Sequence, residues 1–345
     1  MASSRVLVTG GAGFLGHTLV QLLAAWNRSR PSDAVDLLVA DNYARGMPEW
    51  LAVLDGHDDV RCLRHDVTQP LPGGVGAHDW VVHAASIASP TFYRKHPLET
   101  MDANVHGLRL LLDRAVAQAA SGDPLSGFLF FSTSEIYGDP TPDMIPTPET
   151  YRGNVSCTGP RACYDESKRY GETLSVTFAR QYGVPVKIVR PFNNYGPGLN
   201  LHDGRVLPDF ARNVLAGRDV VMHSDGSPTR TFCYVEDAMV GYVRALVRGR
   251  DGEPYNIGVR EPEISMLDLA ERVVAWARDA VGYTGRVVHQ ASEERDYLVD
   301  NPNRRCPVID KAVEELDYDP QVRLDDGLDR AMTWYAGTPA PAGPT

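Results

Sequence analysis

Tyr164 and Lys168 are the first pair whose types and spacing suggest chemistry. They lie four positions apart in Tyr-Asp-Glu-Ser-Lys, within a segment of helical apolar spacing, so they share one helix face. A free tyrosine has a pKa of about 10, and providing its phenolate near pH 7 costs about 4 kcal/mol. A neighbouring ammonium lowers that cost because it favours the charged form. The spacing alone is common by chance, but it makes Tyr164 a candidate acid–base residue.

A second polar group, Ser132-Thr133-Ser134-Glu135, follows an apolar run about thirty residues earlier. If that run is a strand of a parallel sheet, the group lies at the carboxyl end, where α/β proteins bind their ligands. There the Thr133 hydroxyl can hydrogen-bond a substrate hydroxyl, and the Glu135 carboxylate can act as acid or base. The two groups together predict one catalytic site.

The N-terminal run Arg5–Thr9 leads directly into Gly10, Gly13 and Gly16 and then into a helical pattern. Glycines at this spacing allow a tight turn and a close backbone approach, and the helix N-terminus favours a negatively charged pyrophosphate. The order strand, glycine turn, helix is the context that makes such a motif informative. It predicts a dinucleotide-binding site.

Two acidic residues end the next apolar runs. Asp41 stands where a carboxylate bonds the ribose hydroxyls and repels a 2′-phosphate, so NAD is favoured over NADP. Arg45 lies close by in the sequence and leaves NADP open. Asp66, after the third run, is placed either to meet the adenine or to cap the end of its strand.

The elements that must position these residues alternate along the first half of the chain. Helical patterns separate several of the apolar runs, and this alternation predicts an α/β fold with a doubly wound parallel sheet covered on both faces. The expected strands are Arg5–Thr9, Leu37–Asp41, Val60–His65, Trp80–Ala84, Phe128–Ser132 and Val186–Arg190, and the expected helices are Phe14–Trp26, Pro97–Ala120 and Cys163–Tyr182. Beyond Arg190 the pattern changes to the loop Pro191–Gly204, helices at Leu207–Leu215, Val235–Val247 and Met266–Ala280, and a short run at Val220–His223.

Composition excludes several other classes of protein. The chain has 34 Lys and Arg against 45 Asp and Glu, a net charge of −11, which disfavours a nucleic-acid-binding protein and means that an anionic substrate needs a local basic site. Five cysteines without a Cys-x-x-Cys pair indicate neither a disulfide framework nor a cysteine zinc site. No signal peptide and no membrane-spanning run is evident, so we expect a cytoplasmic protein with no membrane partner and no metal.

Four segments carry a resemblance to a known family. They are Thr-Ser-Glu-Ile-Tyr-Gly-Asp-Pro at 133–140, Gly-Pro-Arg-Ala-Cys-Tyr-Asp-Glu-Ser-Lys-Arg at 159–169, Asp-Gly-Arg-Val at 203–206 and Thr-Arg-Thr-Phe-Cys-Tyr-Val-Glu-Asp at 229–237. Over roughly residues 5–335 the chain resembles an extended short-chain dehydrogenase/reductase of the NAD-dependent epimerase/dehydratase group. Within this group, which acts on nucleotide sugars, it is most similar to the UDP-glucuronate decarboxylases, or UDP-xylose synthases.

The resemblance implies a redox-neutral cycle with tightly bound NAD. Tyr164 takes the proton of the sugar C4 hydroxyl as hydride leaves C4, with Lys168 and Thr133 in support. The C4 ketone is then β to the C6 carboxylate and accepts the electrons released with carbon dioxide. By resemblance Glu135 acts around C5, and Ser134 and Arg305 protonate or orient the C5–C6 end. The predicted cofactor site also takes in neighbours of the residues above, namely Phe14, Leu15, Asn42, Val67, Ala84 and Ala85.

For the substrate, the family pattern points to Asn193, Arg205 and Arg230 at the diphosphate and sugar, with Arg305 at the reacting end and His223 at the base. Three positions depart from the pattern. Gly198 replaces a typical arginine, His223 an aromatic residue that stacks on uracil, and Pro228 a more usual glutamine. The nucleotide base is therefore left open between uracil, thymine and another.

Other outcomes can follow from the same 4-ketone. A 4-epimerase acting on UDP-glucuronate is the main alternative, whereas a 4,6-dehydratase is disfavoured because Ser134 stands where that group commonly has an acid. A non-catalytic NAD-binding protein and an ordinary dehydrogenase that releases NADH are further alternatives.

The resemblance also implies a domain arrangement and a partner. We expect an NAD-binding Rossmann domain over 1–190, to which about 234–258 returns, and a smaller discontinuous nucleotide-sugar-binding domain over 191–233 and 259–335. A disordered tail is expected over 336–345. A homodimer is implied through a helix bundle that includes Cys163–Tyr182 and Pro97–Ala120.

Overall fold

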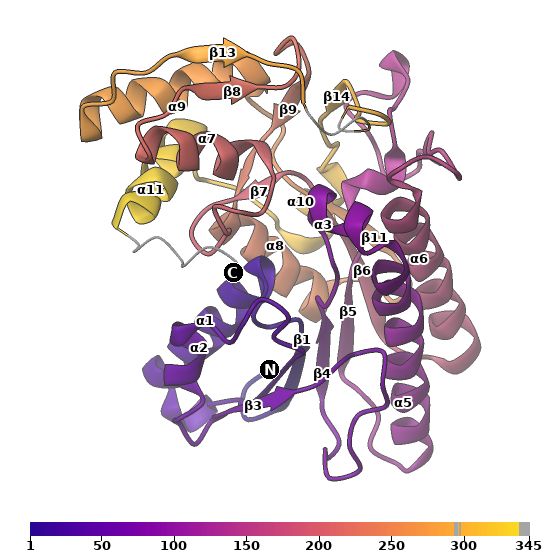
Figure 1. Cartoon of the computed structure of the whole chain (residues 1–345). Helices are drawn as coiled ribbons and strands as arrows, with labels where there is room; N and C mark the ends of the chain where they lie inside the picture. The colour runs from indigo at the N-terminus through magenta and orange to yellow at the C-terminus, as the bar shows by residue number, and fades with distance from the viewer. Residues whose placement is uncertain (293–295, 297, 338–345) are drawn as a thin grey trace.

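The apolar runs of the N-terminal half form neighbouring strands of one parallel sheet. The structure, a computed structural model, describes residues 1–292, 296 and 298–337. The strand order is β11-β6-β5-β4-β1-β2-β3 (Figure 1). Strands β1 to β3 are thus added toward one edge of the sheet and β4 onward toward the other, with the switch between β1 and β4. The bounds are β1 Arg5–Thr9, β2 Asp36–Asp41, β3 Val60–Arg64, β4 Trp80–His83, β5 Gly127–Phe131, β6 Val186–Pro191 and β11 Pro254–Ile257. The predicted doubly wound α/β fold is confirmed.

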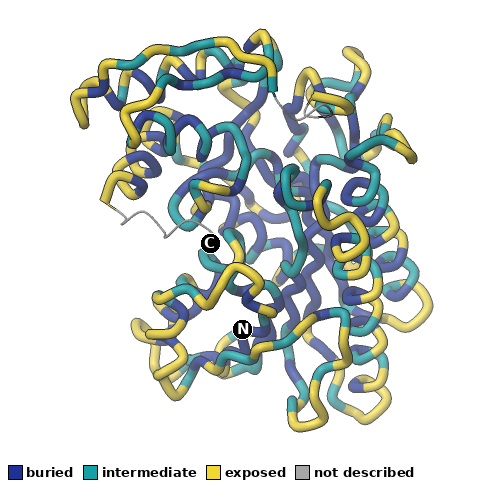
Figure 2. The backbone as a smooth tube through the Cα atoms, viewed as in Figure 1, coloured by how far each residue is buried: buried dark blue, intermediate teal, exposed yellow. Residues whose placement is uncertain are grey.

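Both faces of this sheet are buried because successive side chains of each strand point to opposite faces. Val6 and Val8 pack into the core on the face covered by α1 (Phe14–Ser29) and α8 (Val235–Arg248). Leu7 packs into the opposite core, together with α5 (Leu108–Ala120) and α6 (Ala162–Tyr182). Figure 2 shows the buried strands between the two helical layers. This double burial explains why the strands are almost continuously apolar.

The segment predicted as one helix over 97–120 is helical throughout, but its middle is not α-helical. It consists of α4 (Pro97–Met101), a π-helical stretch Asp102–Gly107 and α5. Asn104, fully buried inside the π-helical stretch, donates from Nδ2 to the Ser167 hydroxyl of α6 at 2.9 Å. The packing between these two helices thus includes a polar contact that helical periodicity does not reveal.

A second, smaller group of elements, which we call the small lobe, has a hydrophobic core of its own. Its short strands pair as β12-β9-β14 and β13-β8, while β7 pairs with β10. The elements are β7 Asn194–Tyr195, α7 Val206–Leu215, β8 Val220–Met222, β9 Thr229–Thr231, β10 Cys233–Tyr234, β12 Glu263–Ser265, α9 Met266–Val281, β13 Val287–His289, β14 Arg304–Arg305 and α11 Leu324–Gly337. Strands of two or three residues have too little periodicity to be predicted from sequence.

Further short helices complete the chain, namely α2 Glu49–Leu54, α3 Pro90–Lys95 and α10 Asp310–Leu316. Because α11 continues through Gly337, the first two residues of the predicted disordered tail are helical, which corrects that prediction; residues 338–345 lie outside the described residues. The predicted domain boundaries stay a prediction. In the described part of the chain, no helix combines the length and the apolar character that crossing a membrane requires.

Candidate active site

A large cavity lies between the carboxyl edge of the sheet and the small lobe. Its volume is about 1290 Å³, which exceeds the roughly 300–1,000 Å³ of an ordinary ligand pocket and leaves room for two ligands. Every residue predicted for the site lines it: Gly10, Gly13, Phe14, Leu15, Gly16, Asp41, Asn42, Asp66, Val67, Ala84, Ala85, Thr133, Ser134, Glu135, Tyr164, Lys168, Asn193, Arg205, His223, Arg230 and Arg305. The fold therefore brings them together, while the role of each stays a prediction.

The glycine turn between β1 and α1 has the shape that a dinucleotide needs. Gly10 has a φ of +75°, and a Cβ there would lie 2.5 Å from the Ala85 backbone nitrogen. A Cβ on Gly16 would lie 2.2 Å from the Gly10 carbonyl oxygen. No side chain caps the N-terminus of α1, and its first turn holds no acidic residue. The helix end is thus open to an anionic diphosphate, and the residues present fit a dinucleotide cofactor.

Asp41 is fixed at the end of β2 by the backbone around it. Its carboxylate accepts hydrogen bonds from the Ala12 nitrogen at 3.0 Å and the Tyr43 nitrogen at 2.8 Å. Asp66 also faces the cavity, but its Oδ1 accepts from the nitrogen and hydroxyl of Thr68 at 3.0 and 2.8 Å. Asp66 therefore caps its own turn as well, so the two interpretations of this residue are compatible.

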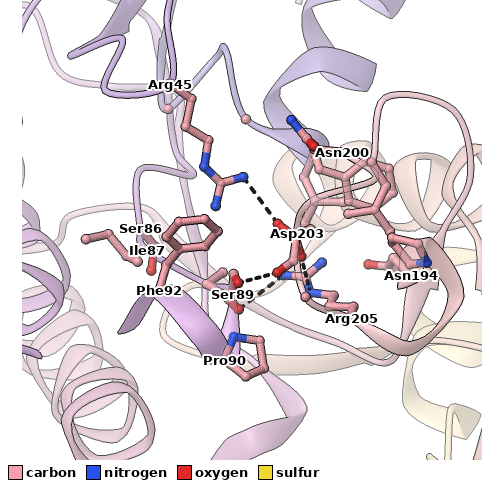
Figure 3. A pocket seen from close by; sticks show the side chains of 18 of the residues that line it. Arg45, Ser86, Ile87, Ser89, Pro90, Phe92, Asn194, Asn200, Asp203 and Arg205 are labelled. Carbon is pink, nitrogen blue, oxygen red and sulfur yellow. Dashed lines mark hydrogen bonds and ion pairs between the residues drawn. The ribbon is translucent and has the colours of Figure 1, made fainter. Parts of the chain in front are cut away.

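Arg45, which left NADP open, is directed away from Asp41 and across the cavity. Its Nη1 lies 3.2 Å from Oδ1 of Asp203, and its guanidinium stacks 4.6 Å from the centre of the Phe92 ring (Figure 3). Asp203 also pairs through Oδ2 with Nε of Arg205 at 3.0 Å. Arg45 thus already has a carboxylate partner in the small lobe, so a 2′-phosphate would have to compete with Asp203 for it, which favours NAD.

Residues 198–205, which we call the clasp loop, run from the small lobe against the large one. The Ser89 hydroxyl donates to the Asp203 carbonyl, and Nη2 of Arg205 donates to the Ala88 carbonyl at 3.2 Å (Figure 3). At the other end of the loop, a Cβ on Gly198 would lie 2.2 Å from Nδ1 of His17 in α1. The His17 ring thus fills the space at the position where the family pattern has arginine.

Tyr164 and Lys168 are buried side by side on α6, as their spacing predicts. Nζ of Lys168 donates to the Phe131 carbonyl at 2.8 Å and lies 5.9 Å from the centre of the Tyr164 ring. Burial lowers the pKa of Lys168 to about 7. Burial also raises the pKa of Tyr164 to about 12, although its hydrogen bond with Thr133 lowers it. The protein by itself therefore keeps Tyr164 protonated, and a bound cation is needed to release its proton near neutrality.

Thr133, Ser134 and Glu135 follow β5 in a 3₁₀ turn, Ser134–Tyr137. The Thr133 hydroxyl accepts a hydrogen bond from the Glu135 nitrogen at 3.2 Å. The same hydroxyl is hydrogen-bonded to Tyr164, so this turn fixes its position. Thr133 and Ser134 are both buried in the cavity wall. The turn therefore places three polar side chains around one end of the cavity.

Glu135 lies between two buried arginines. Its carboxylate is bidentate to Arg305, with both N···O distances 2.5 Å, and also accepts from Nη2 of Arg161 at 2.5 Å. Burial alone would raise the pKa of Glu135, but the two guanidinium groups outweigh burial and hold it at about 2. The carboxylate is therefore charged near neutrality and has no proton to donate.

Arg161 is a charged residue of the cavity wall that the sequence analysis did not single out. It belongs to the segment 159–169 that carries the family resemblance. Its place three residues before Tyr164 was the signal that could have identified it. It is 4% exposed and lines the cavity. Only the fold shows that it meets Glu135.

The remaining substrate candidates are fixed in the wall of the small lobe. The Arg230 guanidinium donates to the carbonyls of Thr229, Pro302 and Asn303, and burial, followed by repulsion from Arg305, lowers its pKa to about 9. Asn193 has a left-handed φ of +42° and donates from Nδ2 to the Thr231 carbonyl at 2.9 Å. Nδ1 of His223 donates to the Gln290 carbonyl at 2.9 Å, because a carbonyl oxygen only accepts.

Comparisons with known proteins agree with this geometry. The model of the NAD dependent epimerase/dehydratase family matches residues 6–258. The chain is 40% identical over 324 residues to UDP-glucuronic acid decarboxylase 3 of Arabidopsis thaliana, which covers 94% of this chain and 86% of the relative. It is 35% identical over 331 residues to UDP-glucuronic acid decarboxylase 1 of Xenopus tropicalis, covering 96% and 72%.

Solved structures show the same architecture. A dTDP-glucose 4,6-dehydratase from Streptomyces venezuelae with NAD bound has a TM-score of 0.81 at 28% identity, and the match covers 96% of each chain. A UDP-glucuronic acid 4-epimerase from Bacillus cereus, in complex with UDP-glucuronic acid and NAD, has a TM-score of 0.76 at 25% identity, covering 96% of this chain and 98% of the other.

Proposed function

The chain belongs to the NAD-dependent epimerase/dehydratase family, and from that premise we propose that it decarboxylates UDP-glucuronate to UDP-xylose. The observation that carries the choice of a uronate substrate is the charge at the reacting end of the cavity. Arg161, Arg230 and Arg305 are all less than a tenth exposed, and Glu135 is the charged carboxylate between two of them. Buried positive charge in an acidic protein requires an anionic ligand group, and a sugar C6 carboxylate supplies one.

The first half-reaction uses Tyr164, Lys168 and Thr133. The glycine turn and Asp41 would hold NAD, which would supply the acceptor for hydride from sugar C4 and the donor that restores it. Tyr164 removes the proton of the C4 hydroxyl at its phenolic oxygen, and Thr133 holds that oxygen by the hydrogen bond that already lowers the pKa of Tyr164. Lys168 adds positive charge beside the ring when it is protonated.

The second step breaks the C5–C6 bond. The electron pair of that bond moves toward the C4 ketone as carbon dioxide leaves, and C5 is then protonated. Because Glu135 is held ionised by two arginines, it orients the C5–C6 end and does not supply this proton. Ser134, buried in the same turn, or a water beside it, remains as the proton carrier to C5.

A 4-epimerase acting on UDP-glucuronate is the second candidate. A solved neighbour of this chain is a UDP-glucuronic acid 4-epimerase, and the arginine-rich wall suits a carboxylate that stays on the sugar equally well. A 4,6-dehydratase needs an acid at the position of Ser134, and serine is a poor one. Decarboxylation is favoured because the relatives that span most of the chain at 35–40% identity are named as decarboxylases.

Incubation of the purified protein with UDP-glucuronate, without added NAD, tests the proposal. We expect loss of one carbon dioxide and a UDP-pentose by mass spectrometry and NMR, with no net reduction of NAD. An unchanged mass with inverted C4 establishes the epimerase. If there is no reaction even after NAD is supplied, the substrate assignment is wrong, and dTDP- and other nucleotide uronates become the next substrates to test.

The clasp loop gives a prediction about cofactor retention. Arg45→Ala removes the ion pair between Arg45 and Asp203. Because the Arg45 side chain is half-exposed, this pair is weak, and we expect NAD to be released only about 2- to 5-fold faster. The measurement is the rate of NAD loss after rapid gel filtration. Arg61→Ala, which breaks the exposed pair with Asp36 at 3.1 Å elsewhere on the large lobe, is the matched control. Equal release rates in the two variants would show that the clasp loop does not retain the cofactor.

We also propose that the protein is a homodimer paired through α4, α5 and α6. Support comes from large apolar side chains exposed on α4 and α6, with Leu98 at 67%, Tyr170 at 51% and Tyr182 at 55%. Light scattering during gel filtration tests this, and a monomer across the micromolar range would refute it.

A cytoplasmic location is proposed because all five cysteines are free. The domain division stated above is likewise kept as a proposal.

A further inference from the structure

Arg161 is a buried cation that has no role in either step of the proposed reaction. It stands just before α6, and its guanidinium lies 5.8 Å from the centre of the Tyr93 ring. That ring is stacked on Tyr164 at 5.0 Å and 7°. Nη2 of Arg161 contacts Glu135, while its Nε has no hydrogen-bond partner among the described residues. The side chain is therefore positioned through Glu135 and Tyr93, within one layer of the reacting tyrosine.

Charge balance shows what this cation is needed for. Both Nη groups of Arg305 donate to the Glu135 carboxylate, and its Nε has no hydrogen-bond partner within the described residues. When a sugar carboxylate arrives, two carboxylates must share this end of the cavity. Arg230 faces the same end but is held by the carbonyls of Thr229, Pro302 and Asn303, so with Arg305 alone one of the two carboxylates would lack a contacting counterion in a buried site, which is costly. With Arg161 present, each carboxylate has one guanidinium.

We propose that Arg161 is a positioning residue for the C5–C6 end of the substrate: it holds the Glu135 carboxylate in place, so that Arg305 can exchange a contact with Glu135 for the C6 carboxylate. This inference rests on the proposed function, because it takes the substrate to be a uronate. It assigns Arg305 to recognition of the substrate carboxylate. It assigns Arg161 to holding the Glu135 carboxylate when Arg305 gives up a contact with it.

The other ionisable groups around Glu135 agree with this assignment. Asp165 lies behind Arg161, with its Oδ2 3.9 Å from Nε. Burial, and then repulsion from Glu135, raises the pKa of Asp165 well above its usual range, and its 3.9 Å contact with Arg161 is much longer than the 2.5 Å contact of Glu135. Arg230 faces the group from the small lobe, and Tyr93 and Tyr164 face it from the large lobe. Near pH 7 Glu135 is thus the carboxylate that Arg161 neutralises.

The test compares Arg161→Gln with Arg161→Lys. We expect Arg161→Gln to lower kcat/KM for UDP-glucuronate about 30-fold or more, as truncating one partner of a buried charge pair does. Glu135 must be charged to act, and losing one cation raises its pKa. The pKa of Glu135 is about 2 in the wild type, so the ratio of variant to wild-type kcat/KM, in which the titration of Tyr164 cancels, should fall further as the pH is lowered from 6 to 4. Arg161→Lys keeps the charge, so its ratio should stay constant over this range while it recovers only part of the rate.

Two further measurements separate a local role from a general loss of structure. Inhibition by UDP-glucose, which has no C6 carboxylate, should change less than about twofold in Arg161→Gln, because its binding does not need the exchange. Arg169→Gln is the matched control: Arg169 donates to the Ile136 carbonyl of the same 3₁₀ turn at 2.9 Å and does not touch Glu135. It should leave the pH profile unmoved.

The outcomes distinguish this inference from the proposed function. If the wild-type protein does not act on UDP-glucuronate at all, the proposed function fails and this inference, which takes the substrate to be a uronate, is overturned with it. If the wild type is active but Arg161→Gln keeps the wild-type pH profile, Arg161 does not hold Glu135. If Arg161→Lys is no better than Arg161→Gln, or UDP-glucose inhibition weakens equally, the residue is structural and the inference is overturned.

Discussion

Tyr164→Phe is expected to lower kcat about 10³- to 10⁴-fold while NAD remains bound, because it removes the oxygen that takes the C4 proton, with its hydrogen bond to Thr133, and keeps the ring. The Tyr164 ring is buried and stacked on Tyr93, and phenylalanine keeps that packing. In the wild type kcat should rise with pH through the apparent pKa of Tyr164. That pKa is about 12 in the protein alone and must fall by several pH units when the positively charged nicotinamide binds.

The measurement is kcat with UDP-glucuronate across pH 5 to 10, together with the NAD content of each preparation. Tyr93→Phe is the matched control, since the Tyr93 hydroxyl is buried and has no hydrogen-bond partner in the described part of the chain. It should leave kcat within a few-fold of the wild type. If Tyr164→Phe retained more than a tenth of the activity, another residue would have to be the base.

Gly16→Ala is the second substitution with a large expected effect, and it acts on cofactor binding. The added Cβ would lie 2.2 Å from the Gly10 carbonyl oxygen and 2.7 Å from Cα of Gly11, both backbone atoms of the turn. That same carbonyl accepts a hydrogen bond from the Gly13 nitrogen at 3.1 Å. Overpacking of this kind costs about 1–3 kcal/mol or more, so we expect NAD affinity to fall up to about 100-fold.

Calorimetric titration with NAD, and the nucleotide content after purification, measure this effect. Gly73→Ala is the control, because a Cβ there meets no atom within 4 Å. Gly13→Ala should be intermediate, since its Cβ would meet only the Gly10 carbonyl oxygen, at 3.3 Å. Wild-type affinity in Gly16→Ala would mean that the turn can open without loss of the cofactor site.

The sequence by itself determined the features that depend on local order. Strand β1 has the predicted bounds, and Tyr164 and Lys168 share a helix face, because apolar periodicity and a spacing of four residues act within one element. The glycine turn was predictable for the same reason, since it joins a strand to the helix that follows it. Asp41 and Thr133 were placed at the carboxyl edge because all parallel strands end there.

The tertiary structure alone decided which charges meet. Arg305 reaches Glu135 across 170 residues of chain, Arg161 across 26, and Arg45 reaches Asp203 across 158. No periodicity connects positions that far apart, because such pairs depend on how the loops after the strands and the small lobe pack together. Burial then set their chemistry: it removed water from Glu135 and Lys168 and left their charge states to the few groups within contact distance. Sequence therefore identified many of the residues that line the cavity, and packing decided which of them are ionised and which are paired.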